Sequence, residues 1–314
     1  MRRRCWHAPA GIYPALARYI FGGFARCFSP TAWGVTGQMS PQTRWWLTLI
    51  AWTIVRWLLP MVPIPPALFA VAAGVAIGIG TAWLLWLTSE GARLWHPRTA
   101  AGMGIGALAL WWALAQGLTA LKPGLMSGLL AAVRDGCLLV AALGFGAAGA
   151  AFIRHANLLP PIAVVVTVMD IWTVLLGGFV HKVQQKAPKV VEAASVALPV
   201  PTASKAVSIT LPLVGVGDWF FAAFFFALLW RFGLKVRATY WLATVLMAAV
   251  LTGLALGLAW LPLALPGLPF LALAVLIPHW RSFHYTPQEK RALAVGGLFL
   301  AGLLVLFSLI ARQM

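Results

Sequence analysis

Long apolar segments recur along this chain, and short stretches that carry the charged residues separate them. Nine of these segments have about the length that an α-helix needs to cross the hydrocarbon core of a bilayer, roughly 20 residues. Their approximate limits are 45–63, 66–88, 100–120, 134–153, 160–180, 210–230, 238–260, 262–279 and 291–311. The pattern predicts an all-α, polytopic integral membrane protein with about nine transmembrane helices.

The composition agrees with a bilayer as the solvent of this protein. Of its 314 residues, 62% are hydrophobic and 9% are charged, whereas about a quarter of the residues in a soluble domain are charged. A net charge of +17 would suggest a nucleic-acid partner in a soluble protein. Here the basic residues cluster in short connections between apolar runs, as the positive-inside rule expects. We therefore expect a lipid bilayer and no nucleic acid as partner.

The domain organisation follows from the same pattern. Residues 1–44 form a basic N-terminal segment whose prolines make it a poor cleavable signal, and we expect an interfacial helix there. Residues 45–314 are expected to form a single membrane domain. The loop charges favour a cytoplasmic N-terminus in a multi-pass protein, which would lie in the cell membrane of a prokaryote. Segment 181–209, rich in Pro, Ala, Ser and Lys, is expected to be a mobile loop.

The three cysteines, Cys5, Cys27 and Cys137, are scattered and show no metal-binding spacing. Neither a disulfide framework nor a zinc site is expected from them. We expect no metal and no cofactor.

Two acidic residues stand out because they lie deep inside predicted spans. Asp170 is about ten residues from either end of its apolar run, and Asp218 is about eight residues into its run. A carboxylate at such depth costs about 2.5–3.5 kcal/mol, so it normally faces a protein interior or a water-filled cavity and marks a functional site. Packing by an interhelical hydrogen bond is the alternative. Asp135, by contrast, follows Arg134 at a span boundary, where a local ion pair is expected.

Two carboxyl groups that meet inside a protein cannot easily both ionise, and they share one proton. One can then accept a proton from water while the other donates to a substrate carbonyl, which is the chemistry of aspartic proteases. Gly215 and Gly217 directly precede Asp218. Their missing side chains permit close backbone approach and local unwinding.

Three segments resemble the presenilin and signal peptide peptidase family of intramembrane aspartyl proteases. GVGDWFFAAFFFALLWRF at 215–232 resembles its GxGD helix, and MDIWTVLLGG at 169–178 is similar to the segment with its first catalytic Asp. ALPGLP at 264–269 resembles its Pro-Ala-Leu motif. The three elements occur in the family's order and cover roughly 160–280.

The resemblance implies a presenilin-like bundle and an intramembrane endopeptidase that cleaves transmembrane helices or remnant signal peptides. It also implies that the segment before Gly215 forms a short strand that pairs with an unwound substrate. The implied catalytic pair is Asp170 and Asp218. The implied substrate-binding or supporting residues are Gly215, Gly217, Pro266, Gly267 and Leu268.

The chain departs from the family pattern at three points. Met169 stands where the family has Tyr, and Gly267 stands where it has Ala. The Asp-bearing spans are the fifth and sixth of the nine predicted here, not the sixth and seventh. Two other functions stay open: a prepilin-peptidase-like GxGD protease, and a proton- or cation-coupled transporter, which also buries aspartates on broken helices.

Overall fold

The computed structural model describes residues 39–119, 122, 124–176, 188–203, 213–257 and 266–313. The chain divides into two units, Met1–Arg44 and Trp45–Met314, and the architecture below is that of the second. The interfacial helix expected within 1–44 falls almost wholly outside the described residues.

The described residues are almost entirely helical, which confirms the predicted all-α class. Their ten α-helices are α2 (Pro41–Leu58), α3 (Pro66–Leu94), α4 (Pro97–Thr119), α5 (Leu125–Ala150), α6 (Leu159–Ile171), α8 (Pro188–Ala193), α9 (Val216–Arg231), α10 (Val236–Ala255), α11 (Leu268–His279) and α12 (Pro287–Gln313). Each predicted span overlaps one of these helices, and the short α8 lies outside all of the predicted spans. Many of the helices begin at a proline, whose fixed φ and missing N–H suit the first helical position.

Five of the helical segments are long and apolar enough to cross a membrane, which indicates a multi-pass membrane protein. They are Pro66–Leu94, Pro97–Leu118, Leu125–Ala150, Ala156–Val174 and Val236–Ala255. The remaining helices include α9, with 16 residues, and α11, with 12. These two are the shorter helices that lie next to the candidate site.

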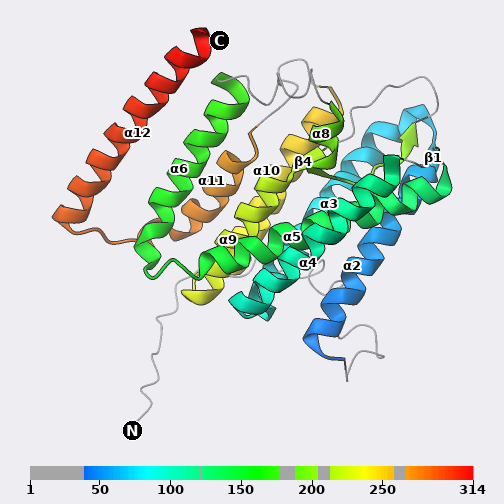
Figure 1. Ribbon diagram of the computed structural model, residues 1–314, viewed down its shortest axis with the longest axis horizontal. Helices are drawn as coiled ribbons and strands as arrows, with labels where there is room; N and C mark the ends of the chain where they lie inside the picture. The colour runs from blue at the N-terminus through cyan, green and yellow to red at the C-terminus, as the bar shows by residue number, and fades with distance from the viewer. Residues whose placement is uncertain are drawn as a thin grey trace, which may run out of the picture. The chain divides into compact units, whose positions relative to one another are not determined.

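Glycines allow α5 to pack closely against both α4 and α9 (Figure 1). Gly144 lies against the α4 backbone at Ala100 and Gly104, and Gly146 lies against the α9 backbone at Phe220. Small residues at such contacts let helix backbones approach one another in membrane proteins. Helix α9 also packs on α3, α3 on α10, α10 on α11, and α11 on α6. This series of contacts brings α6, α9 and α11 into one bundle.

The described residues include four short strands, and all but the first lie between the two Asp-bearing helices in sequence. Strand β2 (Ser195–Ala197) pairs antiparallel with β4 (Leu213–Gly215), with Ser195 opposite Gly215 and Ala197 opposite Leu213. Strand β1 (Pro63–Ile64) pairs in parallel with β3 (Thr202–Ala203).

These strands revise the expectation of a mobile loop at 181–209. Residues 188–203 of that segment fold into α8, β2 and β3, and residues 195–201 are buried. The aliphatic side chains of Val196, Leu198 and Val200 account for this, because they enter the hydrophobic core. The other residues of 181–209 lie outside the described part of the chain.

Candidate active site

Asp170 lies where helix α6 changes its winding. The α-helix ends at Ile171, and a π-helical turn, η4 (Trp172–Leu176), follows. The Thr173 Oγ1 hydroxyl donates to the backbone carbonyl of Asp170 over 3.0 Å. Single π-helical turns occur frequently at functional sites, and here the turn starts two residues after a half-buried carboxyl group.

Asp218 lies in the first turn of α9, which begins at Val216. The sequence places it about eight residues into an apolar run, but β4 occupies the start of that run and the helix begins only after it. A helix N-terminus favours a negative charge because its first N–H groups are unpaired. The backbone N–H of Gly215 donates to the Asp218 carboxylate. The residue directly before the helix therefore supplies a hydrogen-bond donor to this carboxyl group.

The Pro-Gly-Leu segment at the start of α11 touches both aspartates. The backbone N–H of Leu268 donates to Asp170 Oδ2 over 3.0 Å. A methyl group added to Gly267 would lie 2.8 Å from Asp218 Oδ1 and 3.1 Å from Oδ2. The consecutive residues Gly267 and Leu268 thus contact Asp218 and Asp170, so that both carboxyl groups lie at the same turn of backbone.

The two carboxyl groups also interact through their charges, since the Asp170 carboxylate acts on Asp218. In the part of the chain that the structure describes, neither forms an ion pair with a basic side chain. Two carboxyl groups in this arrangement, with no basic partner among the described residues, hold one proton between them more readily than none. The pair can then act as an acid and a base at the same time.

The other residues singled out from the sequence differ in their relation to this pair. Gly215 has an extended backbone and links β4 to α9, and a methyl group on it would lie 3.5 Å from Asp218 Oδ2. Pro266 is buried directly before Gly267. Gly217 is exposed, and a methyl group on it would meet nothing within 4 Å. The structure therefore places Gly215 and Gly267 at the carboxyl groups, and Gly217 beside open space.

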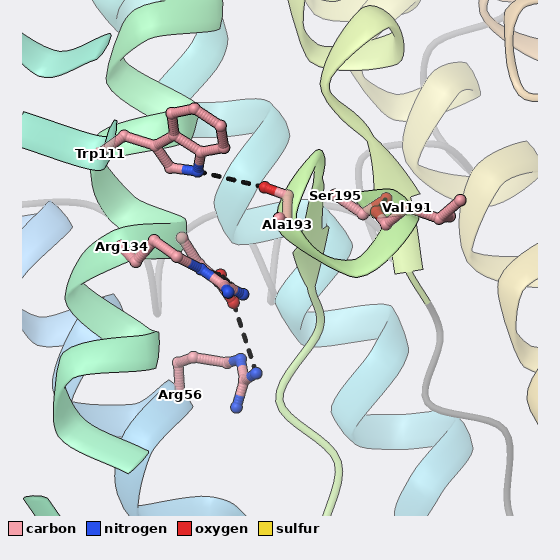
Figure 2. A network of polar contacts seen from close by, with 7 residues as sticks. Arg56, Trp111, Arg134, Val191, Ala193 and Ser195 are labelled. Carbon is pink, nitrogen blue, oxygen red and sulfur yellow. Dashed lines mark hydrogen bonds and ion pairs between the residues drawn. The ribbon is translucent and has the colours of Figure 1, made fainter. Parts of the chain in front are cut away.

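A second polar cluster, which the sequence did not suggest as a whole, surrounds Asp135 (Figure 2). The expected pair with Arg134 is present, with Nη2 to Oδ1 at 3.0 Å. Arg56 of α2 adds a second contact, Nη2 to Oδ2 at 3.4 Å. Asp135 is only 1% exposed and lies ten residues after the start of α5, so it is not at a span boundary. Arg56, a lone charge within the first apolar run, was the available signal.

No protein-family model, no curated protein and no solved structure matches this chain. The resemblance to a protease family consists of three short motifs, and residues from all three lie together at Asp170, Asp218 and Gly267.

Proposed function

We propose that this protein is an intramembrane aspartyl endopeptidase of the presenilin and signal peptide peptidase type, with Asp170 and Asp218 as its catalytic pair. The observation that carries the proposal is the position of Gly267 and Leu268. Residues of three motifs, separated by up to about 98 positions in sequence, contact one another around two carboxyl groups. Packing alone gives no reason for two acidic groups to share one turn of backbone.

The proposed reaction uses the single proton that the pair holds. The ionised carboxylate takes a proton from a water molecule, and the oxygen of that water attacks the scissile carbonyl. The protonated carboxyl group gives its proton to the carbonyl oxygen, so a tetrahedral diol forms. The carboxyl group that received the proton from water then protonates the leaving nitrogen, the C–N bond breaks, and one hydroxyl group of the diol gives its proton to the other carboxylate. These transfers restore the starting state of the pair.

Strand β4 supports a role for the adjacent backbone in binding substrate. A peptide bond within a helix is protected by its hydrogen bonds, so a transmembrane substrate must become extended before hydrolysis. In the described residues, β4 is paired on one edge only, with β2, and Leu213 is exposed. An extended substrate that adds to the other edge of β4 would lie beside Asp218.

The proposed membrane architecture is a presenilin-like bundle of about nine spans. Nine of the described helices overlap the nine predicted apolar runs, and five helical segments meet the length and apolarity of a membrane span. The proposed substrates are transmembrane helices or remnant signal peptides.

The test is cleavage of a fluorogenic transmembrane peptide by the purified full-length protein in lipid nanodiscs. Cleavage that an aspartyl-protease transition-state analogue inhibits, and that both Asp170→Ala and Asp218→Ala abolish, is the expected result. Folded protein that neither cleaves a panel of such peptides nor binds the analogue would overturn the proposal. Proton-coupled uptake in vesicles that Asp170→Asn abolishes would then favour the transporter.

A further inference from the structure

Besides Arg56 and Arg134, Asp135 has a third partner, in the segment that lies between α6 and α9 in sequence. The backbone N–H of Ala197 in β2 donates to the Asp135 carboxylate. Two guanidinium groups and one backbone N–H therefore converge on a single buried carboxylate. They come from α2, from α5 and from β2, so the cluster joins three separate segments of the chain.

The pairing of β2 with β4 explains why the N–H of Ala197 is available. The backbone N–H of Val216 donates to the Ala194 carbonyl over 3.0 Å. In an antiparallel pair, residues that bond to each other alternate with residues whose N–H groups point outward. Ala194 opposite Val216 is a bonded position, so the pair of Ala197 and Leu213 is not. The N–H of Ala197 consequently points away from β4.

The same alternation applies to Gly215 on the partner strand. Gly215 lies opposite Ser195 at another non-bonded position, so its N–H points away from β2, and this N–H donates to Asp218. The two-stranded sheet is thus held between two carboxylates. Asp135 binds its β2 edge, and Asp218 receives a hydrogen bond from its β4 edge.

We propose that Asp135 is a positioning residue for the catalytic pair: by holding β2 in place, it fixes β4 and so aims the Gly215 N–H at Asp218. This inference rests on the proposed proteolytic function. The distance involved is short, because neighbouring strands lie about 4.8 Å apart. A displacement of the sheet reaches Gly215 directly.

Two further contacts hold the same segment and show that it is anchored as a unit. Trp111 Nε1 of α4 donates to the Ala193 carbonyl over 3.1 Å, and Ser195 Oγ donates to the Val191 carbonyl over 2.7 Å (Figure 2). A buried ion cluster is weak as a source of stability, since apolar residues of similar volume often replace one without loss. The hydrogen bonds of the cluster at Asp135 are directional. We therefore expect the cluster to fix the register of a strand more than to stabilise the core.

The experiment compares three variants of the full-length protein in nanodiscs. Asp135→Asn preserves shape but leaves two arginines facing no carboxylate. The double variant Arg134→Gln/Asp135→Asn restores the net charge of the cluster without restoring the carboxylate. Ala197→Pro removes the N–H donor, at a strand position where the N–H makes no ladder bond, and it also restricts φ at this residue.

For the double variant and for Ala197→Pro we expect kcat to fall about tenfold, because a small misplacement of catalytic groups is costly. The KM for the fluorogenic peptide should stay within twofold, and amide hydrogen exchange at 213–216 should become faster. Full activity and unchanged exchange in both variants would overturn the inference. A kcat that Asp135→Asn lowers and that the double variant restores fully would also overturn the inference. The site would then require a balanced charge and not the carboxylate of Asp135.

The two proposals fail in distinguishable ways. A wild-type protein that cleaves no peptide removes the proposed function and with it the catalytic role of Asp135. Wild-type cleavage together with unchanged kcat in Ala197→Pro leaves the protease standing and removes the positioning role alone.

Discussion

Leu268 donates its backbone N–H to the carboxylate of Asp170 over 3.0 Å, although 98 residues separate the two in sequence. Leu268 is the first residue of α11, and the first N–H groups of a helix have no partner within that helix. The carboxylate therefore satisfies a donor that would otherwise be unpaired, and α11 in return orients the carboxylate. Leu268 is thus hydrogen-bonded to Asp170, and its neighbour Gly267 contacts Asp218.

Replacement of either aspartate by Ala should abolish cleavage and leave the fold intact. General acid–base catalysis by a positioned side chain contributes roughly 10²–10⁴-fold, and neither carboxyl group forms an ion pair among the described residues that its loss would disrupt. Initial rates on the fluorogenic peptide and thermal unfolding in detergent measure the two effects. Appreciable cleavage by either variant would exclude that aspartate from the catalytic pair.

Although the family that the chain resembles has Ala at this position, Gly267→Ala should lower kcat by about tenfold or more in this chain, because the new methyl group would force the Asp218 carboxyl group to move. The methyl carbon would lie 2.8 Å from Asp218 Oδ1. The clash is with the end of a side chain, so folding should survive. Gly78→Ala on α3 is the matched control, since a methyl group there meets nothing within 4 Å. Equal activity of the two variants would show that Gly267 is not at the reacting groups.

Gly146→Val should destabilise the protein by about 1–3 kcal/mol, the usual cost of overpacking. A side chain at this position would meet the carbonyl of Phe220 and the side chain of Ala223 on α9. Thermal unfolding in detergent provides the measurement. Gly106→Val on α4, where a methyl group meets nothing within 4 Å, is the comparison. A Gly146→Val melting temperature as high as that of the control would contradict the close approach of α5 and α9.

The rate of cleavage should show a bell-shaped dependence on pH. Only the state with one proton on the pair of Asp170 and Asp218 contains both an acid and a base. Activity should therefore fall at low pH, where both groups are protonated, and at high pH, where both are ionised. Initial rates across a pH series in nanodiscs test this. A profile with a single limb would mean that one titrating group suffices.

The helices could be predicted from the sequence because apolar runs of span length leave little choice in a bilayer. The exact start of α9 could not, since β4 and Gly215 take up the beginning of an apolar run that hydropathy reads as continuous. The contact between Asp170 and Leu268 was implied only by the resemblance of short motifs. The spacing of residues along the α6 segment carries no information about a contact with Leu268, which lies 98 residues further along the chain.

The cluster at Asp135 illustrates the same limit. Its contact with Arg134 follows from adjacency, whereas its contact with Arg56 joins residues 79 positions apart. The burial of residues 195–201 was also missed, because strands of two or three residues are too short to show a hydrophobic periodicity.

Helix α9 has 16 residues, so its axis is about 24 Å long. The hydrocarbon core of a typical bilayer is about 30 Å thick. With α9 along the membrane normal and the exposed Arg231 of its last turn at one membrane surface, Asp218 would lie about 20 Å from that surface and about 10 Å from the opposite one. In the proposed reaction, water would therefore have to enter the membrane by about 10 Å to reach Asp218. Lipids with longer acyl chains would lengthen that path, so the proposed protease should cleave more slowly in thicker bilayers.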